Sequence, residues 1–366
     1  MKQRFYLLVM VAVMVAVGSV QMAAADEWEK VLTAAKKEGT VMVVGPAGSN
    51  RSDSLTVKFQ KKYPDIKVEY WAARGSEIVP KLRAERTAGK FLWDVYVGGT
   101  TSALTAMIPG GMLDAVELAL ILPEVTDSKQ WRGGGIEFVD PGKHLVIMTP
   151  SQFGTLFVNP NAVKPDSIRS HKDLLDPKFK GKISMDDPTK AGPGMAAFTF
   201  FYLHPALGPS FIRELAKQEP IAQTDYMQEV DGIAKNKFLV LIGTSDVIAE
   251  ERMKAGVPIA IVNPRNLKES TGLSPSSGSL GMFNRAPHPN AAKVYINWLL
   301  SKEGQAEFAH ETGYISARLD VSTAHSPWRV PIPGSIKTYT QEAMDVGRNL
   351  IPLIQEAYGL KARPSR

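Results

Sequence analysis

The first helix that the sequence predicts has apolar residues spaced at i, i+3, i+4 and i+7, and Gly39 ends it. These apolar positions are Trp28, Val31, Leu32 and Ala35. A short apolar run follows and predicts a buried strand, because glycine and proline bound it on both sides. The same order of strand, polar or glycine-rich loop, and helix occurs three times before residue 110. The predicted strands are Thr40–Val44, Ile66–Trp71 and Trp93–Val97.

This repeated order predicts parallel pairing of the three strands, with helices on both faces of the sheet. The order breaks between Gly133 and Asn161, where we expect the chain to cross into a second lobe near Thr149–Gln152. The predicted strands there are Lys182–Met185, Phe238–Ile242 and Pro258–Val262. The predicted helices are Met195–Leu203, Phe211–Gln218, Gln228–Asn236 and Val247–Lys254. The residues Ser274–Gly278 predict a linker back to the first lobe.

The length of 366 residues exceeds what one hydrophobic core usually supports. We therefore expect an α/β protein of two lobes, each a mixed sheet flanked by helices. Lobe 1 is expected over 26–148 and 275–320, lobe 2 over 149–274, and the C-terminal helices of 321–366 are expected to pack on lobe 2. Pro352 should kink or split the last helix. Strand-end loops of open α/β sheets form binding sites, so the ligand cleft is expected between the lobes.

The stretch Leu174–Gly194 combines a short strand, a loop with polar tips and the start of an apolar helix. Residues 186–189 are expected to leave the strand end, and residues 192–194 lead into the helix. Backbone N–H groups at a helix start have no intrahelical partner and can hold a ligand. An ordinary strand-to-helix connection has similar residues, and that interpretation stays open.

The first 25 residues predict a cleavable signal peptide. Lys2 and Arg4 form a basic start, the apolar core Leu7–Val17 is too short to span a membrane comfortably, and small residues precede Asp26. The chain has no cysteine that could carry a lipid or form a disulfide. We therefore expect a free periplasmic protein that is not a lipoprotein.

The formal charge of +6 falls to +4 without Lys2 and Arg4. The remaining basic residues are scattered and often stand beside acids, and no basic stripe with interleaved aromatic residues occurs. Nucleic acid is therefore not an expected partner. The histidines lack metal-ligand spacing, so neither a metal nor a cofactor is expected.

Several segments in this order resemble the periplasmic solute-binding proteins of ABC importers, in the group that includes the ferric-iron binders. The resemblance covers nearly the whole chain after the leader. Its segments are Lys61–Trp71, Lys81–Gly99, Asp173–Pro188, Ala286–Gln305 and Gly313–Arg318. It implies a type II-like periplasmic-binding-protein fold, a small-molecule ligand, hinge closure, and transient docking to a permease in the inner membrane. A monomer without enzymatic activity is expected.

The residues that bind iron in this family do not match here. The expected tyrosine pair after the strand Phe238–Ile242 is replaced by Thr244, Ser245 and Asp246. The expected histidine of the first loop is replaced by Gly48, Ser49 and Asn50. Ferric ion prefers phenolate or carboxylate oxygens, and only Asp246 could supply one. The sequence therefore disfavours iron.

The remaining strand-end residues are small, hydrogen-bonding or basic, which suits a carboxylate, phosphonate or phosphate. The candidate ligand-binding residues are Ser49, Asn50, Arg51, Arg74, Gly75, Ser76, Gly99, Thr100, Thr101, Gln152, Asp187, Thr189, Gly192, Thr244, Ser245 and Asp246. Two alternatives stay open. One is a binder of a metal or a cationic solute in the same fold. The other is an exported hydrolase that uses Ser245 or Asp187, although no G-x-S-x-G motif occurs.

Overall fold

The computed structural model describes residues 24–46, 49–73, 75–190 and 192–360, and for residues 49–51, 75, 76 and 348 it describes the backbone only. All but the last two residues of the predicted leader lie outside this part of the chain. Residues 24–38 form a helix, as the apolar spacing predicts. No helix in the described part of the chain is both long and apolar enough to cross a membrane.

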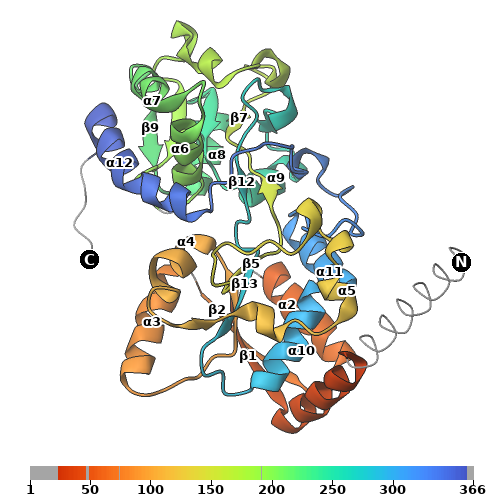
Figure 1. The fold of residues 1–366 in the computed structure, drawn as a ribbon. Helices are drawn as coiled ribbons and strands as arrows, with labels where there is room; N and C mark the ends of the chain where they lie inside the picture. Colours follow the sequence, from red (N-terminus) through yellow and green to blue (C-terminus); the bar gives the residue numbers. More distant parts are fainter. Residues whose placement is uncertain (1–23, 47–48, 74, 191, 361–366) are drawn as a thin grey trace, which may run out of the picture. The chain divides into compact units, whose positions relative to one another are not determined.

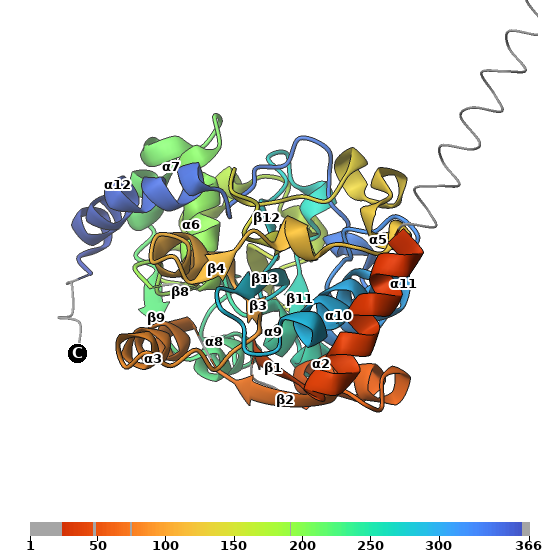
Figure 2. The same cartoon turned by 60° about the horizontal axis from the view of Figure 1, so that its bottom comes forward.

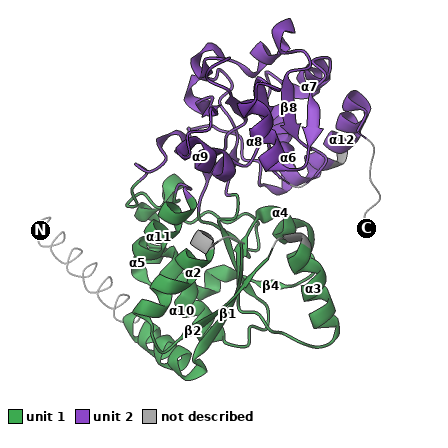
Figure 3. Ribbon diagram, turned by 180° about the vertical axis from the view of Figure 1, so that it is seen from behind, with its two compact units in different colours: residues 1–148, 276–312, 316–322 green, residues 149–275, 313–315, 323–366 purple. Residues whose placement is uncertain are grey.

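The chain divides into two compact units (Figure 3). Unit 1 contains the residues up to 148 together with 276–312 and 316–322. Unit 2 contains residues 149–275 and 313–315 and the chain from 323 onward. Each unit has its own mixed sheet flanked by helices, so the predicted fold class is confirmed.

The sheet of unit 1 has the strand order β2-β1-β3-β13-β4, with β5 also paired to β13. Its strands are β1 (Thr40–Gly45), β2 (Lys67–Ala72), β3 (Val95–Gly98), β4 (Leu113–Asp114), β5 (Val146–Ile147) and β13 (Ser279–Phe283). β1 pairs in parallel with β2 and β3, as the repeated order predicts. β13 is antiparallel to β3, β4 and β5, which makes the sheet mixed.

Helices cover both faces of this sheet (Figures 1 and 2). They are α2 (Ser49–Lys62), α3 (Gly75–Thr87), α4 (Thr100–Ser102) with the π-helix Ala103–Met107, α5 (Pro123–Thr126), α10 (Pro289–Leu300) and α11 (Lys302–Thr312). Ile78 and Leu82 of α3 pack against Val44 and Tyr96 on one face. On the side of α2 and α10, the ring of Phe59 packs against the aromatic rings of α10.

The sheet of unit 2 has the order β11-β7-β10-β8-β9. Its strands are β7 (Leu156–Val158), β8 (Ile183–Asp186), β9 (Ile221–Gln223), β10 (Val240–Ile242) and β11 (Ala260–Ile261). β8, β9 and β10 are parallel, and β7 is antiparallel to β10 and β11. A separate antiparallel ladder joins β6 (Ser151–Gln152) to β12 (Leu273–Ser274).

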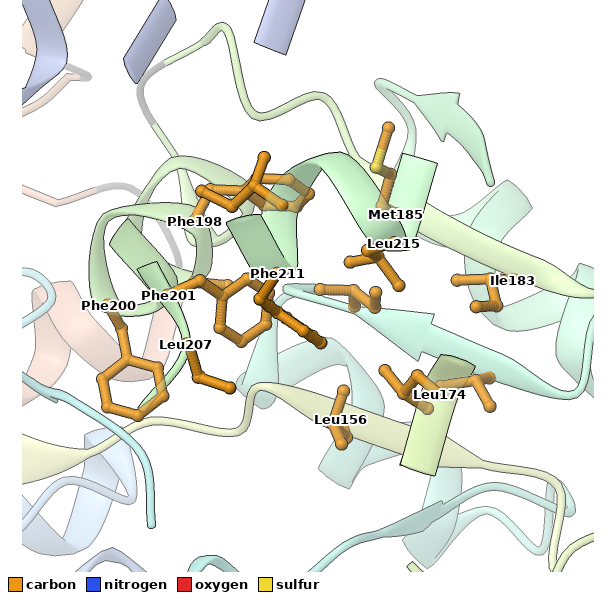
Figure 4. Close-up of a cluster of buried hydrophobic side chains, with 14 of the residues drawn as sticks. Leu156, Leu174, Ile183, Met185, Phe198, Phe200, Phe201, Leu207, Phe211 and Leu215 are labelled. Atoms are coloured by element: carbon orange, nitrogen blue, oxygen red, sulfur yellow. The ribbon is translucent and has the colours of Figure 1, made fainter. Parts of the chain in front are cut away.

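The helices of unit 2 are α6 (Pro193–Leu203), α7 (Gly208–Ala216), α8 (Tyr226–Ala234), α9 (Asp246–Lys254) and α12 (Gln341–Tyr358). Val240 and Ile242 of β10 face the phenylalanine-rich core under α6 and α7 (Figure 4), whereas Leu241 faces the cluster under α8 and α9. This division follows from the alternation of side chains along a strand. α12 packs on α6 and α7.

Two predicted boundaries are wrong, each for a local reason, and one of the two effects predicted for Pro352 does not occur. Asp186 is the last residue of β8 rather than the first of the loop, because it pairs with Gln223. β10 begins at Val240 rather than at Phe238, whose backbone N–H instead donates to the carbonyl oxygen of Gly232 in α8. Pro352 lies inside α12, which runs as one helix and is not split.

Candidate functional site

In unit 1, a helix begins within four residues of the end of each of the three parallel strands. β1 ends at Gly45 and α2 begins at Ser49, β2 ends at Ala72 and α3 begins at Gly75, and β3 ends at Gly98 before α4. The candidates Ser49, Asn50, Arg51, Gly75 and Ser76 therefore lie in the first turns of α2 and α3. Arg74 lies outside the described residues. Because β1, β2 and β3 are parallel, these helix starts lie at one edge of the sheet.

Two tyrosines hold the strand-end loops of unit 1. The Tyr70 hydroxyl donates to Pro46 O at 2.7 Å, and the Tyr96 hydroxyl donates to Gly99 O at 2.8 Å. A Cβ atom at Gly45 or Gly98 would collide with the respective hydroxyl. The two glycines thus let the tyrosine rings reach under the loops, a role that sequence reasoning missed.

The third strand end of unit 1 presents two threonines. Gly99 is the N-cap residue of α4 and has an extended backbone conformation. Because glycine has no side chain, no side-chain hydrogen bond caps this helix start. Thr100 is 6% exposed, whereas Thr101 is exposed. Of the two predicted hydroxyl donors, Thr101 is therefore the accessible one in this structure.

In unit 2, the parallel neighbours β8 and β10 end side by side, at Asp186 and Ile242. The start of α6 packs against the turn after β10, because a Cβ atom at Gly243 would lie 2.8 Å from Gly194 Cα. Gly243 has a φ of 67°, which only glycine adopts readily. This turn brings Thr244 close to the end of β8.

Asp186 carries the buried charge at this edge. Its Oδ2 accepts a hydrogen bond from Gly194 N at 2.8 Å, and its residue is 7% exposed. Burial raises the pKa of Asp186 to about 6, with the neighbouring charge of Asp187 adding to the rise. The predicted Gly192 lies beside it, since a Cβ atom there would lie 2.9 Å from Asp186 Oδ2.

Asp187 and Thr189 bond mainly to each other. Asp187 Oδ1 accepts from Thr189 N at 3.0 Å and from Thr189 Oγ1 at 2.6 Å, and Lys190 Nζ lies 3.4 Å from Asp187 Oδ2. Both side chains are half-buried at the loop tip. They form a turn that presents a hydroxyl, a carboxylate and an ammonium group together.

Glu229 is a buried acid near the same edge that sequence reasoning missed. It lies in the first turn of α8 and is 0% exposed. Burial raises its pKa to about 8, and the charges of Asp186 and Asp225 add to the rise. Its sequence signal was weak, because Glu229 stands in a polar run that is typical of a solvated helix face.

The side chains of two other candidate residues already form hydrogen bonds with residues of the same chain. The Asp246 carboxylate accepts from Gly154 N at 3.1 Å and from Arg329 Nη1 at 3.0 Å. The Gln152 side chain is buried, and its amide is satisfied when the nitrogen faces Thr271 and the oxygen faces Ser335. Ser245 is the half-buried N-cap residue of α9, whose side chain makes no capping bond.

The hydrolase alternative predicts a histidine beside Ser245 or Asp187. The buried histidine of unit 2, His171, instead lies 3.0 Å from Thr155 Oγ1 and 3.4 Å from Glu269 Oε2. All three residues are at most 7% exposed, so this hydroxyl, imidazole and carboxylate belong to the packed interior. Within the described residues, no group of three or more acidic or histidine side chains is arranged to hold a metal ion.

A model of the bacterial extracellular solute-binding proteins matches residues 54–332 of the sequence. The chain belongs to this family. A protein of Haemophilus influenzae described as uncharacterised is 27% identical to this solute-binding protein over 288 residues. The alignment covers 76% of this chain and 78% of the other.

Two solved structures share the fold of this solute-binding protein. The periplasmic binding protein AfuA of Actinobacillus pleuropneumoniae, with exogenous fructose 6-phosphate bound, is 21% identical, covers 88% of this chain and 99% of its own, and has a TM-score of 0.64. The Trichodesmium protein IdiA (FutA), in complex with iron and citrate, is 17% identical, with 87% and 99% coverage and a TM-score of 0.65. These likenesses confirm the expected type II-like fold.

Proposed function

We propose that this chain is the periplasmic solute-binding component of an ABC importer and that its two units close by hinge rotation on a small oxyanion that also carries hydroxyl groups. A membrane permease is the partner that receives the solute. The observation that carries the proposal is the unequal distribution of acidic groups between the strand ends of the two units.

The strand ends of unit 1 suit a negative charge. The first turns of α2 and α4 contain no acidic residue, so no carboxylate in the first turn neutralises the positive ends of these helices, whereas the first turn of α3 contains Glu77. The sequence at and next to the starts of α2, α3 and α4 contains residues whose side chains carry hydroxyl, amide or guanidinium groups, namely Ser49, Asn50, Arg51, Arg74, Ser76 and Thr101. Backbone N–H groups and guanidinium groups bind phosphate and carboxylate oxygens.

The strand ends of unit 2 suit hydrogen-bond donors instead. Asp186 already accepts from Gly194 N at the start of α6, and Asp225 accepts from the N–H groups of Met227 and Gln228 at the start of α8. These carboxylates oppose an incoming anion, but they accept hydrogen bonds from hydroxyl groups. The solute would therefore direct its charge to unit 1 and its hydroxyl groups to unit 2.

The ligands named for the two similar structures support this class of solute. Fructose 6-phosphate and citrate are both oxyanions that carry hydroxyl groups. A cationic solute is the second candidate, and the acidic strand ends of unit 2 are the observation that favours it. The absence of phenolate at Thr244, Ser245 and Asp246 speaks against ferric ion alone.

A thermal-shift screen of the mature protein tests the proposal. It compares matched pairs of ligands, in which an oxyanion is set against a neutral compound of similar structure. We expect fructose 6-phosphate or citrate to raise the melting temperature and fructose to leave it unchanged, since a ligand at 100 times its Kd stabilises by about 2.7 kcal/mol. Arg51→Ala or Arg74→Ala should weaken the best ligand about tenfold, because a charge-assisted hydrogen bond is lost. Arg83→Ala, on an exposed side of α3, is the control. A neutral sugar or a cation as best ligand contradicts the proposal.

A further inference from the structure

Glu229 and Thr244 form a buried pair whose polar atoms are unsatisfied. Both residues are 0% exposed. Within the described part of the chain, three buried atoms of this pair lack a hydrogen-bond partner of good geometry. They are both carboxylate oxygens of Glu229 and the hydroxyl oxygen of Thr244. The hydroxyl is nevertheless close enough to lower the pKa of Glu229. A single hydrogen bond between the two groups would satisfy both, and such bonds are the rule for buried polar atoms.

The charges around Glu229 favour its neutral form. Asp186 on β8 and Asp225 at the start of α8 both raise its pKa. Asp186 in turn faces Asp187 and, as a cation, Lys190. On α9, Asp246 is paired with Arg329, and Arg252 donates to the exposed sulfur of Met227. The helix α6, which packs on β8, contributes no charged residue.

We propose that Glu229 is a positioning residue for the strand-end loops of unit 2 and that it holds them only while its carboxyl is protonated. The inference rests on the proposed function, because these loops carry Thr189 and Thr244 and follow Asp186, the last residue of β8. A neutral carboxyl and the Thr244 hydroxyl complete one hydrogen bond in the interior. An ionised carboxyl places a second negative charge beside Asp186, and the charges that act on Glu229 are the acids Asp186 and Asp225, so burial strongly disfavours it. The ends of β8 and β10 then separate.

The pH dependence follows from the raised pKa. Because the folded state binds the Glu229 proton more tightly than the unfolded state does, the order of these loops is complete at low pH and is lost as pH rises through about 8. Above this value the protonated fraction falls about tenfold for each further pH unit. Burial also raises the pKa values of Asp186 and Asp246, but only to about 6, which is below this window.

Amide hydrogen exchange of the mature protein between pH 6 and 9.5, corrected for intrinsic rates, tests the inference without any ligand. The protection of the backbone amides of Asp187, Thr189, Lys190 and Thr244 should fall about tenfold per pH unit above pH 8. Glu229→Gln, a neutral isostere, should keep the protection of the wild type at pH 6.5 and hold it to pH 9.5. Glu251→Gln, at an exposed position of α9, should follow the wild type.

Equal pH profiles for Glu229→Gln and the wild type would overturn the inference. If Glu229→Gln does not fold, carbon NMR of the Glu229 carboxyl in the wild type decides, and a midpoint below pH 6 overturns it. The proposed function fails separately, when the ligand screen finds no oxyanion. If the screen finds an oxyanion but amide protection does not change with pH, only the proposed role of Glu229 is refuted.

Discussion

Arg329 ties the segment before α12 to the first turn of α9. Its side chain is 1% exposed, with Nη1 3.0 Å from Asp246 Oδ2 and Nη2 paired at 3.0 Å with Glu250 Oε2, although the latter pair lacks hydrogen-bond geometry. The guanidinium also lies over the Trp328 ring at 4.3 Å. Burial raises the pKa of Asp246 to about 6 even beside this cation. The energetic cost of desolvating the two charges therefore largely offsets the attraction between them.

Arg329→Ala should lower the free energy of unfolding by about 3–5 kcal/mol at pH 7.5, because it leaves the Asp246 charge buried without its partner. The loss should shrink as pH falls below 6, since Asp246 then takes up a proton. Urea denaturation at both pH values measures it. Arg265→Ala, which removes only an exposed bond to Val330 O, should change stability by less than about 0.5 kcal/mol. Equal effects of the two variants would refute this role of Arg329.

The residue types at the strand ends could be read from the sequence, but their partners could not. Asp246 looks like a ligand residue until Arg329, 83 positions later, is folded against it. Gln152 looks polar and available, yet Thr271 and Ser335 enclose it. Glu229 looks solvated, yet it is buried. Long-range contacts decide each case, and no local pattern encodes them.

At the scale of elements, local patterns were sufficient for most helices and strands. Gly39 and Gly243 punctuate the chain where the sequence predicts turns, and both have positive φ. The antiparallel course of β13 could not be read locally, because it depends on how residues 276–283 return to the first sheet. The same holds for the contact between Gly243 and Gly194, which fixes α6 against β10.

Gly243→Ala should destabilise unit 2 in two ways, through its positive φ and through a Cβ atom placed 2.8 Å from Gly194 Cα. Gly256→Ala provides the match, because Gly256 has a φ of 80° but nothing within 4 Å of its added Cβ. We expect about 1–2 kcal/mol for Gly256→Ala and clearly more for Gly243→Ala. Thermal unfolding measures both. A cost for Gly243→Ala no larger than the control would disprove the role of the close contact.

At the scale of the whole molecule, two independently packed cores are joined by a chain that passes between units near residues 149, 275 and 312–323. The helix α12 packs on α6 and α7 of unit 2, where the Tyr358 hydroxyl donates to Ile212 O at 3.0 Å. Separate cores allow each unit to move as a body while its own sheet stays intact. Such an arrangement suits closure by rotation at the connections rather than by refolding.

Small-angle X-ray scattering of the protein without residues 1–25, with and without the oxyanion found in the thermal-shift screen, tests the central claim that the two units close on a solute. The account predicts a smaller radius of gyration at saturation, with unchanged secondary structure by circular dichroism. The neutral control compound, for example fructose as the control for fructose 6-phosphate, should leave the radius of gyration unchanged. A radius that stays the same at saturating oxyanion would contradict the account.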